Sequence, residues 1–304
     1  WMLTRWAQNA TQHMQMVMAD WCGLLCLCEH KPTAPNTAPA RVVTQLMRQS
    51  IMQTVMEGHV PVVPADIFMT TGDARDQGVS VDGYRWWGST ANFGDLFAFI
   101  KAQASLIDSY EKLATVHVAV CNDSWPFSEG GSSTKFDALC ARLGELWRRD
   151  VDYHFLPVGE DSGSLPEAPN RTRETTAPII IRVQDDADYM SYLGRLAGPK
   201  FRRWSTAAAD EAMGHSPVRS TNVNVRATAR YNAAAGRVSV HLHNYAVNSD
   251  GTPLAQTTTL LWNWGGAGVA DVVRLGESGT AVDLSGGSAQ VTLTEYAIVN
   301  FAVT

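Results

Sequence analysis

The spacing of apolar residues changes near residue 200, from a mixture of helical and strand patterns to strand patterns alone. Before that point, short continuous apolar runs alternate with segments in which apolar residues recur at three- and four-residue steps. Continuous runs are typical of parallel strands that are buried on both faces, and the second spacing is typical of amphipathic helices. The pattern therefore predicts a layered α/β region followed by an all-β region.

The first region is predicted to alternate strands and helices. In chain order we expect a helix over 4–19, a strand over 24–28, a helix over 41–57 closed by Gly58, a strand over 60–64, a helix over 93–107 capped near Thr90 or Asn92, a strand over 115–120, a helix over 136–147, and strands over 153–158 and 179–181. This order favours parallel strands.

The second region is predicted to contain strands only. They are expected over 223–231, 237–247, 257–264, 272–275, 280–284 and 290–303, separated by glycine-containing turns. Short strands at this spacing indicate an antiparallel β-sandwich. The stretch 207–217 is interpreted as the linker between the two regions.

Composition narrows the class of protein. The 304 residues are 45% hydrophobic and 18% charged, which favours a well-packed core over disorder. The formal net charge of -6 argues against nucleic acid or an anionic membrane surface as the main partner. No apolar run approaches the roughly 18 residues that span a bilayer. Five cysteines are too few and too uneven for a disulfide scaffold.

The start of the chain bears on its origin. It begins at Trp1 and lacks the charged-then-apolar pattern of a signal peptide, so we expect either a processed protein or a fragment of a longer one. Sequons at Asn9, Asn122 and Asn170 are compatible with secretion but do not establish it, and the compartment stays unknown.

Two carboxylates follow predicted strands at matching places. Glu29, with His30 behind it, comes directly after the strand over 24–28, and Asp66 comes shortly after the strand over 60–64. In barrels of alternating strands and helices, the carboxyl ends of the strands open onto the active-site face. Paired carboxylates there carry out glycoside hydrolysis. The alternative is that Glu29 is merely the first solvated residue after its strand and that Asp66 caps a turn.

An aromatic segment, Tyr84-Arg85-Trp86-Trp87-Gly88, lies in a polar, glycine-rich stretch. Two adjacent indole rings must either pack against the protein or offer a stacking face, because exposing both is costly. A flat aromatic face matches the apolar face of a sugar ring, so this segment is a candidate carbohydrate platform. The alternative is that one Trp ties the loop to the core.

The cysteines offer weaker candidates. Cys121 ends a predicted strand and could act as a nucleophile, but no histidine stands beside it in a recognisable motif, and a buried thiol is the favoured interpretation. Cys22, Cys26 and Cys28 with His30 resemble a metal cluster, yet their apolar strand context argues against zinc.

His241 and His243 share one face of a predicted strand, as two metal ligands would. Because no third ligand can be named, we expect surface or interdomain histidines instead. There is also no glycine-rich loop of the dinucleotide or P-loop type. We therefore expect no metal and no cofactor.

Taken together, these segments resemble the C-terminal portion of TIM-barrel glycoside hydrolases that end in a β-sandwich. The resemblance is carried by Cys28-Glu29-His30-Lys31-Pro32, by residues 60–66 (VPVVPAD), by residues 84–88 leading into 93–99 (FGDLFAF), and by the strand 237–245 (RVSVHLHNY).

The resemblance implies a fold of class α/β plus all-β. It places a partial (β/α)8-barrel segment over 1–112, a small flavodoxin-like α/β unit over 113–206 and a C-terminal antiparallel β-sandwich over 217–304.

The resemblance also implies the site. Glu29 matches the nucleophilic glutamate at the end of the seventh barrel strand, as nucleophile or stabilising carboxylate, and Asp66 lies at the end of the eighth. Asp66, Tyr84, Trp86, Trp87 and His30 are the implied substrate-binding residues, and the partner is a carbohydrate. The acid/base residue of the fourth strand has no counterpart in this chain, so we expect a fragment that hydrolyses glycosides poorly.

Two other classes stay open. One is a non-catalytic carbohydrate-binding or structural module that uses the aromatic segment without an acid pair. The other is a cysteine-dependent acyl-transfer domain built on Cys121. The sugar, the linkage and the oligomeric state are not indicated by the sequence.

Overall fold

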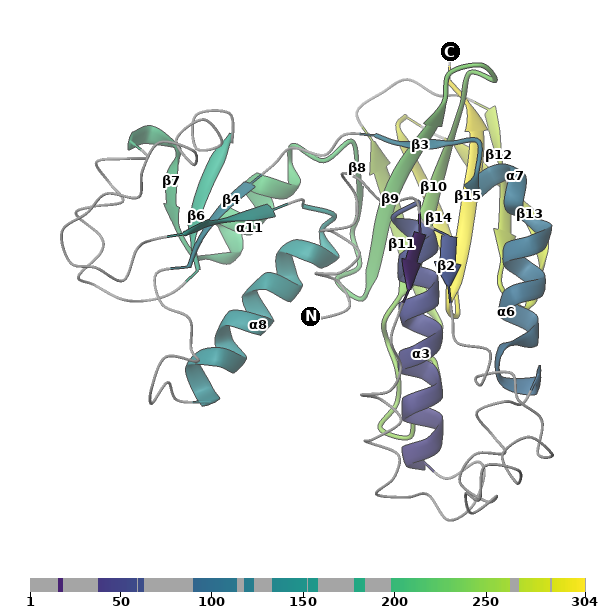
Figure 1. Cartoon of the computed structure of the whole chain (residues 1–304). Coiled ribbons are helices and arrows are strands. Elements are labelled where there is room, and N and C mark those ends of the chain that lie inside the picture. Colours follow the sequence, from purple (N-terminus) through teal and green to yellow (C-terminus); the bar gives the residue numbers. More distant parts are fainter. Residues whose placement is uncertain are drawn as a thin grey trace. The chain divides into compact units, whose positions relative to one another are not determined.

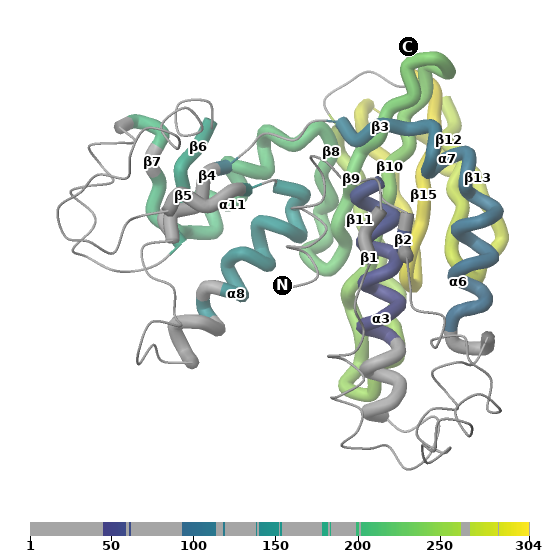
Figure 2. The backbone as a smooth tube through the Cα atoms, viewed as in Figure 1, coloured from purple at the N-terminus to yellow at the C-terminus, as the bar shows by residue number. Residues whose placement is uncertain are grey.

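The structure is a computed structural model. It describes residues 16–18, 38–58, 60–62, 90–113, 118–122, 133–151, 153–157, 178–183, 198–262, 268–284 and 286–303. By their internal contacts these residues form two compact units: an α/β unit within 114–219, and a sandwich unit within 2–113 and 220–304. The second unit therefore combines segments from the two ends of the chain, which Figure 2 shows in purple, blue, green and yellow.

The sandwich unit begins with a parallel strand–helix–strand element. Strand β1 (Met16–Met18) pairs in parallel with β2 (Val60–Val62), and helix α3 (Ala38–Met56) connects them. The predicted helix is confirmed, and Gly58 follows it with a φ of 86°. The strand predicted over 60–64 is confirmed at Val60–Val62, and its last two positions lie outside the described residues. The helix expected over 4–19 is wrong at Met16–Met18, where pairing with β2 overrides local propensity. The strand expected over 24–28 lies outside the described residues.

The second region is built of β-strands, as predicted. Its strands are β8 (Val218–Ser220), β9 (Val225–Asn232), β10 (Arg237–Asn244), β11 (Gln256–Trp262), β12 (Gly268–Arg274), β13 (Glu277–Leu284), β14 (Ser288–Leu293) and β15 (Tyr296–Ala302). Strand β3 (Glu111–Lys112) pairs with β9 from the first region. The single strand expected over 290–303 is two strands, because the chain turns at Thr294 and Glu295.

Within the described residues these strands form a six-stranded sheet, in the order β13-β12-β15-β10-β9-β3, and a three-stranded sheet, in the order β14-β11-β8. The strand pairs of the larger sheet are antiparallel. Trp262 of β11 stacks on Phe301 of β15, with ring centroids 5.1 Å apart, so the two sheets meet through side chains. This arrangement is compatible with the predicted β-sandwich.

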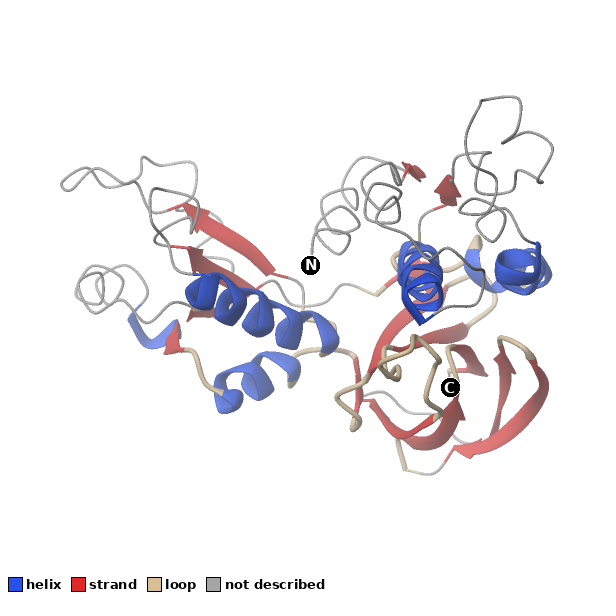
Figure 3. Ribbon diagram, turned by 90° about the horizontal axis from the view of Figure 1, so that it is seen from below, coloured by secondary structure: helices blue, strands red, loops and turns tan. Residues whose placement is uncertain are grey.

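Helices cover the other face of the six-stranded sheet. They are α3 together with α6 (Thr90–Ala102) and α7 (Ala104–Ile107), which lie beside the sheet in Figures 1 and 3. Every residue of α3 from Ser50 onward is buried, as is Glu57 after it. Because a helix turns once in about 3.6 residues, burial over this run means that α3 is covered on all sides.

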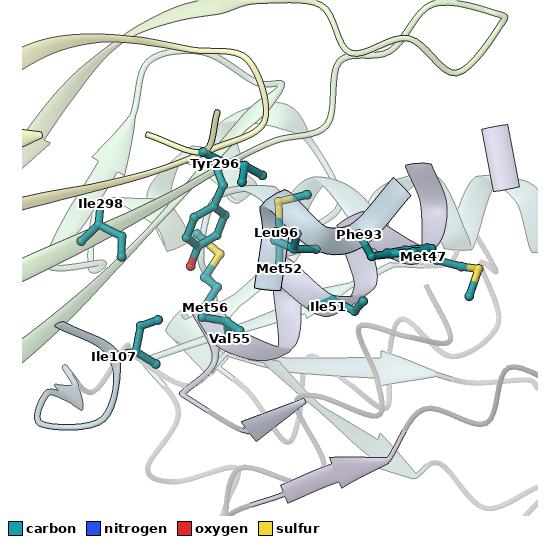
Figure 4. Packing of buried hydrophobic residues seen from close by; sticks show 11 residues of the cluster. Met47, Ile51, Met52, Val55, Met56, Phe93, Leu96, Ile107, Tyr296 and Ile298 are labelled. Carbon is teal, nitrogen blue, oxygen red and sulfur yellow. The ribbon is translucent and has the colours of Figure 1, made fainter. Parts of the chain in front are cut away.

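An apolar cluster joins these helices to the sheet (Figure 4). Its buried members are Met47, Ile51, Met52, Val55, Met56, Phe93, Leu96, Ile107, Leu275, Tyr296 and Ile298. Residues that are far apart in the sequence thus share one core, which explains why the two ends of the chain form one unit.

Strand β10 is buried on both of its faces, although its sequence alternates. Val238, Val240 and Leu242 share one side of β10, and this side faces the sandwich core, since Phe301, the register partner of Val238, contacts Trp262 of the second sheet. Ser239, His241 and His243 lie on the opposite side, which the helices cover. We call the side with Val238, Val240 and Leu242 the apolar face of the sheet, and the side with Ser239, His241 and His243 the helix-facing side.

The α/β unit has a sheet of four parallel strands in the described residues, ordered β5-β4-β6-β7. The strands are β4 (Val118–Asn122), β5 (Tyr153–Pro157), β6 (Ile179–Arg182) and β7 (Phe201–Arg203); its helices are α8 (Ser133–Arg148), η3 (Gly198–Lys200) and α11 (Thr206–Met213). The predicted helix over 136–147 and the predicted strand over 179–181 are confirmed. The strands predicted over 115–120 and 153–158 are confirmed where the structure describes them, at 118–120 and 153–157. Ile179, Ile180 and Ile181 are all buried, so both faces of β6 are covered.

The linker expected over 207–217 is wrong, because helix α11 occupies most of it. The Ser205 side chain accepts a hydrogen bond from the Ala208 amide and caps the helix. Ala208, Ala209 and Ala212 are its buried face. Alanine has the highest helix propensity, so the sequence carried this signal.

Candidate functional site

The sequence-predicted site lies outside the described residues. This holds for the candidate catalytic residue Glu29 and for the substrate-binding residues His30, Asp66, Tyr84, Trp86 and Trp87. The structure does describe the elements from which two of these stretches emerge, because β2 ends shortly before Asp66 and α6 begins shortly after Trp87. The described part of the candidate site is therefore the set of contacts that holds α3, β2 and α6 in place.

A buried carboxylate connects the end of α3 to the sheet. The Glu57 side chain is fully buried, and its Oε1 lies 2.7 Å from Arg226 Nη2 of β9. Its Oε2 lies 2.8 Å from Lys112 Nζ of β3. Gln53 donates to Oε1 at 2.8 Å and accepts a hydrogen bond from the Tyr245 hydroxyl at 2.6 Å. We call these five residues the Glu57 cluster.

The energetics of the Glu57 cluster favour a single arrangement. Removing charges from water costs several kcal/mol for each ion, and only close, hydrogen-bonded partners repay it. Here one carboxylate receives donors from the helix and from two strands, so a shift of α3 along the sheet would leave buried charges without partners. The cluster therefore specifies the position of α3.

Arg230 of β9 binds the carboxyl ends of two helices. Its guanidinium donates to the carbonyl oxygens of Met56 at the end of α3, of Ile107 at the end of α7, and of Tyr110. The carbonyls of Met56 and Ile107 are ones that a helix leaves unpaired at its end, where a positive charge is also favourable. Burial lowers the pKa of Arg230. Gly58 is required beside it, because a Cβ there would overlap the guanidinium and because its φ is positive.

The two histidines of β10 lie in the same layer but differ in their contacts. His241 has Tyr296 Oη 2.7 Å from Nδ1 and Ser239 Oγ 3.3 Å from Nε2. Neither ring nitrogen of His243 has a hydrogen-bond partner among the described residues. The ring of His243 packs on Tyr245, with centroids 4.0 Å apart.

Both histidines are kept neutral by their surroundings. Burial, and then the charge of Arg230, lowers the pKa of His241 to about 3. Burial, and then the charge of Arg226, lowers the pKa of His243 well below its usual value. Of the two expected positions, surface or interdomain, the surface position is wrong, since both histidines are fully buried. In the described part of the chain, no group of three or more His, Cys, Asp or Glu side chains could hold a metal ion.

A second charged group holds α3 nearer its middle. Arg48 makes two hydrogen bonds to Asp95 of α6, at 2.8 and 2.9 Å, and two to Glu295 in the turn before β15, at 2.8 and 2.9 Å. Gln45 also donates to Glu295, at 2.9 Å. Burial alone would lower the pKa of Arg48, but the hydrogen bonds and charges of Asp95 and Glu295 outweigh it and raise that pKa. Arg48 thus ties α3, α6 and the sheet together.

Glu57, Arg226, His241 and His243 are buried by the fold, so we assign these side chains a structural role, which is to fix the helices on the sheet. Glu57, Arg226 and Arg230 were not predicted from the sequence. The available signal was that Arg226, Thr228 and Arg230 alternate with apolar residues along one strand, which shows that they share a side but not that helices cover it.

Comparisons with known proteins give fold likeness only. No family model and no curated protein matches the chain. Among solved structures, α-L-fucosidase isoenzyme 2 from Paenibacillus thiaminolyticus matches with a TM-score of 0.50 and 11% identity, covering 99% of this chain and 62% of that one. An apo exo-carrageenase GH42 from Bacteroides ovatus has a TM-score of 0.38 and 9% identity, covering 86% of this chain and 39% of that one. CelM2, a bifunctional glucanase-xylanase from a metagenome library, has a TM-score of 0.25 and 14% identity, covering 99% of this chain and 68% of that one.

The structural neighbours are thus glycoside hydrolases, in agreement with the resemblance found in the sequence. At these identities the likeness concerns the fold, and only the fucosidase match is strong enough to argue from. The chain spans 62% of the length of that fucosidase. None of the helices within the described ranges combines the length and the apolar character that crossing a membrane requires.

Proposed function

We propose that the chain is a glycoside-hydrolase-like protein in which a partial (β/α) barrel is fixed on a β-sandwich. The observation that supports this most strongly is the parallel element β1-α3-β2, which shares one compact unit with the antiparallel sheets. The fold likeness to the fucosidase agrees with it.

In this proposal the strand ends carry the chemistry. Glu29 is the nucleophile or the carboxylate that stabilises the oxocarbenium-like transition state, and Asp66 contacts the sugar. Trp86 and Trp87 stack on sugar rings, while Tyr84 and His30 donate hydrogen bonds to hydroxyl groups. The Glu57 cluster and Arg230 support the site by fixing the end of α3, which leads directly into β2 and so toward Asp66.

The proposal also assigns the three parts of the chain. The segment 1–112 is the barrel part, 113–206 is a small flavodoxin-like unit, and 217–304 is the sandwich. The parallel order β5-β4-β6-β7 supports the second of these assignments. A carbohydrate is the partner.

Isothermal titration of the full chain with aryl α-L-fucoside, β-D-galactoside and β-D-glucoside tests the proposal. We expect one of them to bind, Trp86→Ala to weaken binding at least 10-fold, and Glu29→Gln to abolish any turnover of that glycoside while leaving the fold intact by circular dichroism. Asp283→Asn, which removes an exposed carboxylate of β13, is the matched control and should change nothing.

Two results would overturn the proposal. One is a folded protein that binds none of the three glycosides. The other is binding that Trp86→Ala abolishes while Glu29→Gln alters neither binding nor turnover, which would instead establish a non-catalytic carbohydrate-binding module.

A further inference from the structure

Two histidines lie inside the helix-facing side of the six-stranded sheet, and the sugar site proposed above uses neither of them. Both are completely buried on β10. His241 contacts Tyr296 and Ser239, whereas neither ring nitrogen of His243 has a hydrogen-bond partner among the described residues. Histidine is the side chain whose charge ordinarily changes between pH 5 and 8. The buried pair therefore makes the contact between the helices and the sheet a place where pH can act.

The surroundings of His243 disfavour a positive charge. His243 pairs in register with Arg226 of β9, so the two side chains lie on the same side of neighbouring strands. Like charges directly opposite each other in a sheet are destabilising. The nearby buried carboxylate, Glu57 of α3, already binds Arg226 and Lys112. A proton on His243 would thus place a second cation beside Arg226 without a carboxylate to balance it.

The other titratable groups of the surrounding elements do not supply a buried counter-charge within the described residues. They are phenols that are neutral in mild acid, a cation, carboxylates that are exposed, and carboxylates that bind Arg48. By element these are Tyr296 of β15, Tyr245 after β10, Tyr110 and Asp108 after α7, Glu111 of β3, Arg230 of β9, and Asp95 of α6 with Glu295, which bind Arg48 of α3.

The pKa values of the two histidines agree with this arrangement. Burial, and then the charge of Arg230, lowers the pKa of His241 to about 3. Burial, and then the charge of Arg226, lowers the pKa of His243 well below its usual value. On the other side of β10, the apolar face carries valine and leucine, which do not titrate. Acid therefore acts on one side of the strand and not on the other.

We propose that the contact between α3 and the six-stranded sheet is a conformational switch that opens in acid: protonation of His241 and His243 releases α3, while the two sheets stay packed on each other. Release gives both rings to water, where they take up protons near pH 6.5. Because the closed state binds fewer protons, lowering the pH below that value favours the open state by a factor that approaches 10 per pH unit for each histidine. The switch belongs to α3 and the sheet and does not depend on the sugar site.

Amide hydrogen exchange of the full chain at pH 7, 6, 5 and 4 tests the switch. Each rate is expressed as a protection factor, relative to the unfolded chain at the same pH, for 44–56 of α3 and for 256–262 and 288–293 of the second sheet. We expect the protection of α3 to fall about 60-fold between pH 6 and 5, about 8-fold for each histidine with an open-state pKa of 6.5. Protection of α3 should be lost at a pH at which 256–262 and 288–293 are still protected.

His243→Phe separates this effect from a general effect of acid. It keeps a ring of similar size and should reduce the fall in α3 protection between pH 6 and 5 to about 8-fold. His215→Phe is the matched control, because His215 is an exposed histidine of the α/β unit, and it should leave the fall at about 60-fold. His241→Phe should reduce the fall as His243→Phe does, and far-ultraviolet circular dichroism at pH 7 checks that each variant is folded.

Three results would overturn the proposal. One is loss of protection in α3 and in the second sheet at the same pH, which would indicate unfolding of the whole unit. Another is protection of α3 that stays constant from pH 7 to 4. The third is a fall of about 60-fold that persists in a folded His243→Phe or His241→Phe variant, since the histidines would then not be the groups that take up the protons.

Discussion

In strands β9, β10 and β15 both sides of the six-stranded sheet are buried, but different interactions hold the two sides. On the apolar face, Val240 and Leu242 pack against the second sheet through the hydrophobic effect, which has no preferred direction. On the helix-facing side, Arg226, Arg230 and His241 are buried among named partners at hydrogen-bond distance. The apolar face therefore accepts any well-filled packing, whereas the helix-facing side accepts only the helix that brings Glu57 and the carbonyl ends to the right places.

The largest effect is expected from Glu57→Gln. This change keeps the size of the side chain but removes the carboxylate that Arg226 and Lys112 share, and breaking a buried pair in this way costs about 4 kcal/mol. The free energy of unfolding, measured by urea titration of the full chain, should fall by that amount. A loss below about 1 kcal/mol would show that the helix-facing side is not specified by its charges.

On the apolar face, Leu242→Ala is expected to cost about 3 kcal/mol, the sum of lost burial and of the cavity left behind. The same urea titration measures it, and the slope of the transition should not change. Val299→Ala, on the register partner strand β15, is a milder companion variant on the same face. An effect of Leu242→Ala that exceeds that of Glu57→Gln would reverse the comparison.

The pH dependence of stability should come from the helix-facing side. Because the pKa values of His241 and His243 are lower in the folded state than the usual value near 6.5, the unfolded state binds more protons in mild acid. The free energy of unfolding should therefore fall as the pH drops below about 6.5, by about 1.4 kcal/mol per pH unit for each histidine.

The variant His243→Phe distinguishes the contribution of His243 to this pH dependence from that of His241. It should remove half of this slope between pH 6 and 5, and it should raise stability at pH 7 by about 1 kcal/mol, since the ring nitrogens of His243 have no partner among the described residues. His241→Phe should also remove half of the slope but lower stability at pH 7, because Tyr296 and Ser239 lose their partner. Urea titrations at several pH values measure both, and an unchanged slope in both variants would contradict the account.

The smallest effect is expected outside both sides of this sheet, at the Arg202–Glu211 pair. Both side chains are solvent-accessible, and water screens such pairs. Glu211→Gln should leave the midpoint of urea unfolding unchanged within error. A loss comparable to that of Glu57→Gln would show that burial does not explain the difference between the two ion pairs.

Much of the secondary structure could be predicted from the sequence, because the spacing of apolar residues reports which side of an element is buried. Helix α3 and strands β2, β9 and β10 follow this pattern. The turn at Thr294 and Glu295 lacks glycine and proline, so two strands read as one. At β1, pairing with a strand far along the chain overrides the local helical signal.

The polar layer could not be predicted, for a physical reason. Alternation places Arg226, Arg230 and His241 together on one side of the sheet, but the same pattern is typical of a solvated side. Whether helices cover it depends on contacts between the two ends of the chain, which no local pattern contains. The sequence-predicted sugar site lies outside the described residues, so it stays a prediction.

A crystal structure of the full chain soaked with the glycoside that binds tests the central claim most directly. The account predicts that the Glu29 carboxylate and the indole rings of Trp86 and Trp87 line one concave pocket beyond the end of β2, with the sugar ring between them. Electron density that places Glu29 on the opposite side of the molecule from Trp86 and Trp87 would contradict it.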